Sequence, residues 1–192
     1  MKATSAATIT CRHDVNIWES EPVLLLVDIV KLVLFPSLMA FAASSDLLTM
    51  TISNRISLTL AAGFLGLALA TGMSAATIGM HLGAGAVVLV MAFACYARGW
   101  IGGGDAKLAA ATALWFGFDQ LFNYLLCASL FGGVLTLAII RFRELPLPDS
   151  LAKSEWIARL HQVDMGVPYG IALALAALVI YPSTAWMNLS GM

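Results

Sequence analysis

Apolar runs long enough to cross a lipid bilayer are the feature that most limits how this sequence can fold. A helix needs about 20 predominantly apolar residues to span a hydrocarbon core of roughly 30 Å. Of the 192 residues, 60% are hydrophobic and only 11% are charged, against about 25% charged residues in typical soluble domains. We therefore expect an all-α, polytopic integral membrane protein.

Six apolar runs divide the chain and predict a bundle of about six transmembrane helices. They cover 23–43, 56–72, 76–96, 106–118, 120–140 and 168–187. The fourth run is short and is separated from the fifth only by Asp119 and Gln120, which requires a locally thin membrane or an upright helix. We expect a membrane-embedded domain over 23–192, preceded by a polar segment, 1–22, whose composition permits disorder.

The distribution of Lys and Arg predicts the orientation of the bundle. With the N-terminus outside, the loops 44–55, 97–107 and 141–167 face the cytoplasm. They hold Arg55, Arg98, Lys107, Arg141, Arg143, Lys153 and Arg159, whereas the outer side keeps only Lys2 and Arg12. The positive-inside rule favours this topology.

Charge and cysteine content exclude several classes of function. A net charge of −1, without a basic patch, excludes nucleic acid as a partner. The three cysteines, Cys11, Cys95 and Cys127, form no CxxC pair that could hold zinc or exchange disulfides. Within the first run, Asp28 and Lys31 lie three positions apart, where we expect them to pair.

Two aspartates fall at the predicted cytoplasmic face. Asp46 follows the first run, and Asp105 follows the three glycines of "WIGGGDAK" at the start of the fourth. Ionisable groups at this depth are costly in lipid and suggest a functional site. If the helices bring the two carboxylates within a few Å, they share one proton, so that one activates water and the other acts as acid toward a peptide carbonyl. This scheme needs no metal and no cofactor.

The glycines Gly102, Gly103 and Gly104 suit such a site. Without Cβ atoms they let the backbone turn sharply into the helix and let a substrate strand approach Asp105. Lys107, two residues further on, lies near enough to the cytoplasmic surface to reach lipid headgroups.

These motifs resemble those of the type IV prepilin peptidases. "GGGDAK" matches the family's G-x-G-D-x-K, "DLLTMTISN" (46–54) is similar to its D-L-x-x-x-x-I-P-N, and "VPYGIALALA" from Val167 is similar to the P-Y/F-G segment that opens its last helix. The resemblance covers 40–180 and implies that Asp46 and Asp105 are the catalytic pair. The residues implied to support the substrate or the loops are Gly102, Gly103, Gly104, Lys107, Asn54, Pro168, Tyr169 and Gly170.

The resemblance also implies a substrate and a location. Prepilins and pilin-like proteins carry a short basic leader before a hydrophobic helix, and the family cuts at that junction, on the cytoplasmic face of the bacterial inner membrane. The implied partners are a prepilin or pseudopilin, the pilus assembly machinery and the lipid bilayer. Longer members methylate the new N-terminus with a domain that carries paired cysteines. This chain has neither room for that domain nor such a pair, so it resembles the short form of tight-adherence (Flp) pilus systems and predicts cleavage without methylation.

Other interpretations stay open at this point. The family's Ile-Pro-Asn is Ile52-Ser53-Asn54 here, which removes a proline restraint from the loop. Asp46 could be a helix cap, and Pro168 suits a first helical turn. A presenilin-like protease is disfavoured because the chain lacks a Pro-Ala-Leu motif. The alternative from another class is a small transporter or channel that uses the two aspartates as an ion or proton relay, although such proteins usually show an internal repeat.

Three further features carry structural expectations. His81 stands alone in the third run and is expected to contact another helix. Trp18, Trp100 and Trp186 lie near segment ends, as an interfacial belt requires. From Ser150 onward, the loop 141–167 has apolar residues at helical spacing, which predicts an amphipathic surface helix that bridges the bundle or gates the site.

Overall fold

The computed structural model describes residues 17–187, and every regular element in that range is helical. The long helices are α1 (Ile17–Thr49), α2 (Asn54–Ala70), α3 (Ala75–Ala97), α4 (Gly103–Glu144) and α7 (Tyr169–Ile180). The short ones are α5 (Asp149–Ala152), α6 (Glu155–His161) and two 3₁₀ turns, η1 (Tyr181–Ser183) and η2 (Ala185–Met187). The all-α prediction is confirmed. Residues 1–16 of the expected polar segment lie outside the described range.

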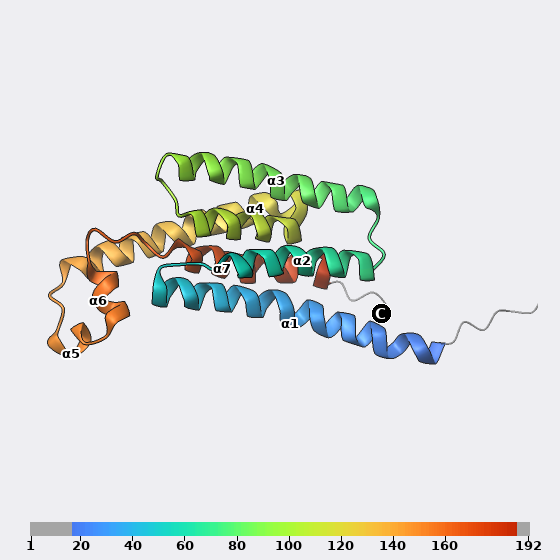
Figure 1. Cartoon of the computed structure of the whole chain (residues 1–192), viewed down its shortest axis with the longest axis horizontal. Coiled ribbons are helices and arrows are strands. Elements are labelled where there is room, and N and C mark those ends of the chain that lie inside the picture. Colours follow the sequence, from blue (N-terminus) through green and yellow to red (C-terminus); the bar gives the residue numbers. More distant parts are fainter. Residues whose placement is uncertain (1–16, 188–192) are drawn as a thin grey trace, which may run out of the picture.

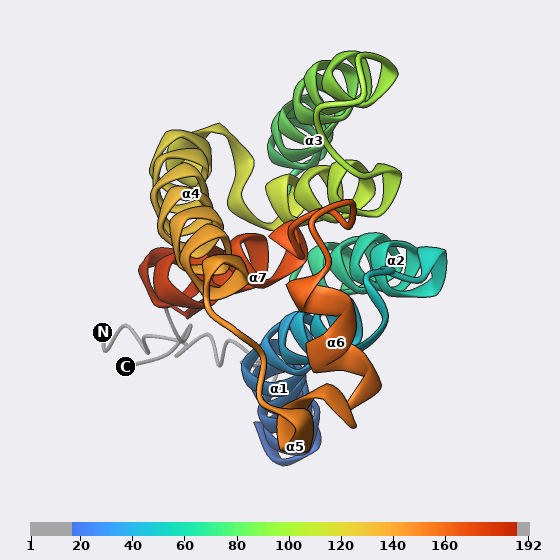
Figure 2. The same cartoon turned by 90° about the vertical axis from the view of Figure 1, so that its left-hand side faces the viewer.

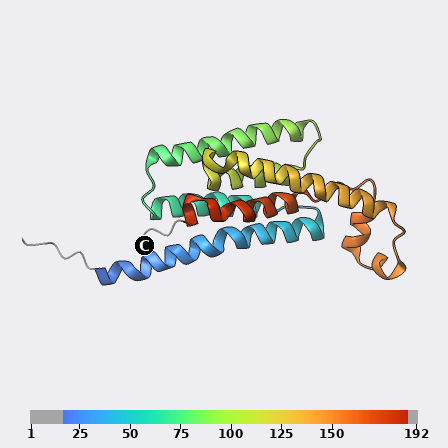
Figure 3. The ribbon, with the colours of Figure 1, turned by 180° about the vertical axis from the view of Figure 1, so that it is seen from behind.

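The long helices run back and forth along one direction, and α4 bends back on itself (Figure 1). The ends of α1, α3 and α4 and the starts of α2, α4 and α7 gather at one end of the bundle, together with α5 and α6. The view from behind shows the same order (Figure 3). The predicted loops 44–55, 97–107 and 141–167 therefore meet at the same end, as the charge distribution requires.

The bend in α4 lies at Gly117, two residues before the break expected at Asp119. Gly117 has φ 57° and ψ −169°, a positive-φ, extended conformation that is essentially restricted to glycine. A bend frees carbonyls that a continuous helix would pair. Leu114 O accepts a hydrogen bond from His81 Nδ1 (2.6 Å) and Trp115 O from Trp186 Nε1 (2.8 Å). The expected role of His81 as a helix contact is confirmed.

Aromatic side chains fill the core around the bend. Trp115 is fully buried and donates its Nε1–H to Leu60 O of α2 at 3.0 Å. Phe35 of α1 and Trp186 of η2 pack on it, with ring centroids 5.0 Å and 5.3 Å away. Because Trp186 is buried, its expected place in an interfacial belt is wrong, whereas Trp100 is exposed. The side chain of Trp18 lies outside the part that the structure describes.

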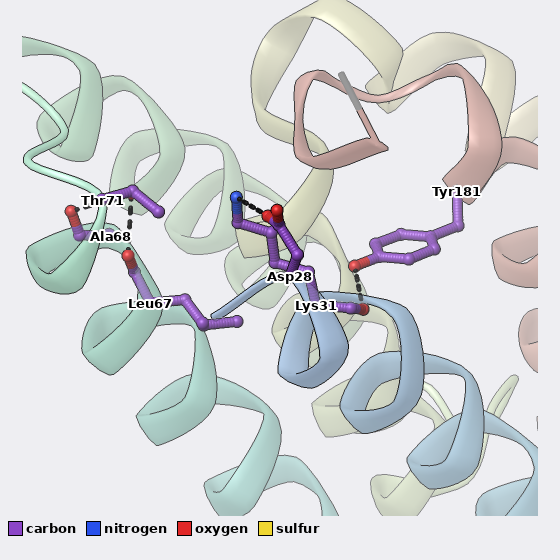
Figure 4. A network of polar contacts seen from close by, with 6 residues as sticks. All are labelled: Asp28, Lys31, Leu67, Ala68, Thr71 and Tyr181. Carbon is purple, nitrogen blue, oxygen red and sulfur yellow. Dashed lines mark hydrogen bonds and ion pairs between the residues drawn. The ribbon is translucent and has the colours of Figure 1, made fainter. Parts of the chain in front are cut away.

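The predicted pair inside the first helix is confirmed. Lys31 Nζ donates to Asp28 Oδ1 at 3.0 Å, and Lys31 is buried despite its charge. Next to this pair, the hydroxyl of Tyr181 donates to the backbone carbonyl of Lys31 at 2.7 Å (Figure 4). The Asp28 carboxylate is the partner that a buried ammonium group requires. The separate hydrogen bond from Tyr181 joins η1 to α1.

Within residues 17–187, three helices are long and apolar enough to cross a membrane by themselves: Leu25–Thr49 within α1, Ala75–Ala97 and Gly103–Glu144. Asn54–Ala70 and Tyr169–Ser183 are shorter apolar helices. A polytopic membrane protein follows from these lengths. Six crossings stay a prediction, which requires each half of α4 to cross separately.

Candidate active site

Asp46 lies in the last turn of α1 and not in the loop expected after residue 43, because α1 continues to Thr49. Met50, with φ 52°, then ends the helix in the left-handed conformation typical of helix C-termini. Asp46 is only 5% exposed. Its Oδ2 accepts a hydrogen bond of 2.7 Å from the backbone N–H of Gly170. The carboxylate thus sits at the N-terminus of α7, where backbone N–H groups lack helical partners and the helix dipole is positive.

The segment Pro168-Tyr169-Gly170 makes this contact possible. Pro168, fully buried, is the N-cap residue of α7, as its expected place in a first turn suggests. A Cβ on Gly170 would lie 2.7 Å from Asp46 Oδ2 and 2.6 Å from Ile52 Cδ1. Only glycine lets α7 approach α1 this closely without displacing the carboxylate.

Asp105 is the third residue of α4, after the N-cap Gly102. An acidic side chain in the first turn of a helix interacts favourably with the positive end of the helix dipole. Its Oδ2 lies over Gly102, where a Cβ would be only 2.9 Å away. Its Oδ1 is buried without a hydrogen-bond partner among the described residues. Such an unpaired oxygen is costly, and it leaves Asp105 free to bind an incoming group.

The glycines before Asp105 act through close packing. None of the three has a positive φ; the positive φ in this connection belongs to Gly99 (φ 73°), which ends α3. Gly103 and Gly104 are already helical, so the turn expected at Gly102–Gly104 lies before them and that expectation is wrong. A Cβ on Gly104 would lie 3.1 Å from Ile52 Cβ, and one on Gly103 would lie 3.3 Å from the ring of Tyr96.

Ile52 joins the two halves of the site. It packs against Gly104, next to Asp105, and against Gly170, which binds Asp46. The two carboxylates are close enough for their charges to interact. The structure thus brings together two aspartates that lie 59 positions apart in the sequence.

A cleft of about 530 Å³ opens beside Asp105. Its walls come from the α3–α4 connection, from Thr136 in the second half of α4, and from the segment before α7. Tyr169 lines it and packs against Gly132, where a Cβ would overlap its ring. Asp105 is among the lining residues, whereas Asp46 is not.

Asn54 and Lys107 pair with each other at the starts of α2 and α4. Lys107 Nζ donates to Asn54 Oδ1 at 2.9 Å, and both side chains are exposed. That Lys107 reaches lipid headgroups stays a prediction; in the structure it ties α2 to α4. Ser53, at the position of the missing proline, is the N-cap of α2 and accepts from Arg55 N at 3.3 Å. A side-chain cap thus restrains the loop in place of the proline ring.

The segment 141–167 bridges the bundle. In place of the single amphipathic helix expected from Ser150, it forms the short helices α5 and α6. Arg143 donates to the carbonyls of Leu160, Met165 and Gly166, and Arg159 donates to Leu48 O at 2.9 Å. Arg159 therefore fastens α6 to the end of α1 that carries Asp46.

Sequence reasoning missed several residues of this site. Gly99 and Thr136 carry no charge and no distinctive motif, so nothing in the sequence singled them out. Ile52 belongs to the matched motif 46–54, but its contacts with Gly104 and Gly170 could not be read from the motif. Arg143 and Arg159 were counted only as positive charges. Within 17–187, no three His, Cys, Asp or Glu side chains gather as metal ligands.

The comparison with protein families found one match. The model of the type IV leader peptidase family matches residues 33–137, more than half of the chain. This range contains both aspartates and ends before α7. The comparisons with curated proteins and with solved structures found no match.

Proposed function

Because the chain belongs to the type IV leader peptidase family, aspartic-type prepilin peptidases, we propose that Asp46 and Asp105 are its catalytic pair. The single observation that carries this proposal is the convergence of both carboxylates around Ile52, with one held by Gly170 and the other open to the cleft. The substrate implied by the family is a prepilin or pilin-like protein whose leader is removed.

The two aspartates have different environments and therefore different tasks. Asp46 has one oxygen engaged by Gly170 N–H and does not line the cleft. Asp105 lines the cleft, and one of its oxygens has no hydrogen-bond partner within the described part of the chain. Asp105 is therefore the carboxylate that the peptide meets first, and Asp46 completes the pair from the side of α7.

Hydrolysis by the pair conserves one shared proton. The water oxygen bonds to the scissile carbonyl carbon, one water proton passes to the ionised aspartate, and the other aspartate gives its proton to the carbonyl oxygen. The proton taken from water then passes to the leaving amine as the carbon–nitrogen bond breaks. A hydroxyl proton of the intermediate returns to the second aspartate, so the pair again holds one proton.

The membrane topology proposed with this chemistry places the site at the cytoplasmic face of the inner membrane. The N-terminus lies outside, and the chain crosses six times. Arg and Lys are concentrated in the loops at the end of the bundle that holds Asp46 and Asp105. This distribution supports the proposed orientation. A bond between a basic leader and a hydrophobic helix lies at this depth.

We further propose that the enzyme cleaves without methylating the new N-terminus, in a tight-adherence (Flp) pilus system. The absence of a cysteine pair supports this, since the three cysteines are far apart in the sequence. Mass spectrometry of the processed pilin checks it. An N-terminal methyl group, added by the purified enzyme in the presence of a methyl donor, would contradict it.

The decisive experiment compares Asp46→Asn and Asp105→Asn with Asp119→Asn, an aspartate beside the bend of α4. Each is expressed beside a prepilin, and leader removal is followed by a mobility shift. Both site variants should stop cleavage while inserting at normal levels, and Asp119→Asn should cleave normally. Normal cleavage by either site variant would remove that aspartate from the pair. Cleavage by the purified enzyme in detergent separates this function from ion transport, which needs a closed membrane.

A further inference from the structure

An apolar groove lies on the side of α4 opposite the cleft, and its proposed role does not depend on the catalytic proposal. The groove has a volume of about 540 Å³ and lies between α2, α3 and the first half of α4. Its surface is almost entirely apolar and includes Leu58 and Ala61 of α2, Ala86 of α3, and Ala111 and Leu114 of α4. Such a groove in a membrane-embedded bundle must be filled by something apolar.

The groove is open because α2 and α3 pack on α4 but hardly touch each other. Seen from the end that carries the aspartates, the first half of α4 lies between them (Figure 2). Lys107 lines the groove and Asp105 lines the cleft. Two positions along a helix turn the side chain by about 200°, so the groove and the cleft lie on opposite faces of α4.

The dimensions of the groove favour flexible chains over a helix. Its lining runs from Asn54 to Ala61 on α2 and from Lys107 to Leu114 on α4, which at 1.5 Å per residue is about 10 Å. The groove is open along its side. A flexible acyl chain follows such a shallow apolar surface more closely than a rigid helix about 10 Å in diameter does.

Polar groups occur only at the mouth of the groove, next to the aspartate end of the bundle. Lys107 is exposed and carries three donor hydrogens, of which one goes to Asn54. Ser57 is 9% exposed and lines the groove, and its hydroxyl has no hydrogen-bond partner among the residues that the structure describes. A cation beside a buried unpaired hydroxyl suits the phosphate and ester oxygens of a lipid.

We propose that this groove binds one anionic diacyl phospholipid, with its acyl chains on the alanine-rich floor and its phosphate at Lys107 and Ser57. The lipid then fills the space between α2 and α3 and supports the Asn54–Lys107 contact at its mouth. Phosphatidylglycerol is a suitable probe, and zwitterionic phosphatidylcholine is the matched comparison.

Native mass spectrometry of the full chain in detergent, titrated with each lipid, tests the proposal. The unaltered protein should bind the first phosphatidylglycerol about fivefold more tightly than phosphatidylcholine, the effect of one lysine near a headgroup. Ala86→Phe should weaken both lipids about tenfold, because a phenyl group displaces roughly two methylenes from the groove. Ala94→Phe, an exposed alanine of the same helix outside the groove, is the matched control and should bind like the unaltered protein.

Lys107→Gln tests the headgroup contact independently, because it removes the charge and leaves the apolar part of the groove unchanged. It should bind both lipids equally, with its phosphatidylcholine affinity retained. Normal lipid binding by Ala86→Phe, or a retained fivefold preference in Lys107→Gln, would overturn the proposal. If Ala86→Phe keeps its lipid but raises the KM for a prepilin more than Ala94→Phe does, the groove instead holds the hydrophobic helix of the substrate.

Discussion

Replacing Gly170 with alanine tests whether α7 positions Asp46 for catalysis. The added methyl group would lie 2.7 Å from Asp46 Oδ2 and 2.6 Å from Ile52 Cδ1, whereas ordinary contacts begin near 3.4 Å. To restore an ordinary contact, the carboxylate must move by about 0.7 Å. It then loses the hydrogen bond of 2.7 Å from Gly170 N–H. The perturbation is therefore a small displacement of one carboxylate in a helix that otherwise accepts alanine.

Two magnitudes determine the expected loss. A hydrogen bond to a charged group contributes about 1.5–3 kcal/mol, and a misplacement of about 1 Å at a reacting centre can lower a rate about 100-fold. We expect kcat to fall about 10- to 100-fold in Gly170→Ala. The KM for a prepilin should change little, because Gly170 does not line the cleft beside Asp105.

The assay is leader cleavage by purified enzyme in detergent, with kcat and KM measured separately and a melting temperature for each variant. Gly66→Ala is the matched control, because it also lies within a helix and a Cβ there meets nothing within 4 Å. The double variant Gly170→Ala/Ile52→Val relieves the contact with Ile52 but not that with Asp46, so its kcat should stay low. Unchanged kcat in Gly170→Ala, or full recovery in the double variant, would refute the role assigned to Gly170.

Three further perturbations test the rest of the structure. Gly117→Ala should lower the melting temperature, because alanine at φ 57° and ψ −169° costs about 1–3 kcal/mol and its Cβ would lie 3.0 Å from the His81 ring. Gly79→Ala is the control and should not lower it, because a Cβ there meets open space. His81→Ala leaves a carbonyl at the bend unpaired and should destabilise the protein by about 1–3 kcal/mol, measured by denaturant unfolding. A double-mutant cycle on Asn54→Ala and Lys107→Met should give a coupling below about 1 kcal/mol, as exposed contacts do, and a larger value would contradict the exposed geometry.

Much of the candidate site could be predicted because its motifs are local. Asp105 follows three glycines in one short stretch, and Asp46 follows the first apolar run. Counting the apolar runs between the two aspartates was enough to place both at the same end of the bundle. The pairing of Asp28 with Lys31 followed in the same way from helical spacing. Each of these inferences needs only the order of residues along one element.

The predictions that were wrong concern neighbours far away in the sequence. Trp186 was expected at an interface, yet its Nε1–H donates to Trp115 at the bend of α4. The turn into α4 was expected at Gly102–Gly104, whereas those glycines mainly admit Ile52 and Tyr96. Local patterns cannot identify such partners, because these depend on which helices pack together.

By itself, the sequence determined the class of this protein and the side of the bundle at which its aspartates meet. Apolar length selects a membrane helix, and the bias of Lys and Arg orders the loops; both are properties of single segments. Only the tertiary structure decided that Asp46 ends on the N-terminus of α7, that Ile52 lies between the two halves of the site, and that α4 reverses at Gly117. These features depend on distances of a few Å between helices, and close packing sets those distances only when all the helices are assembled.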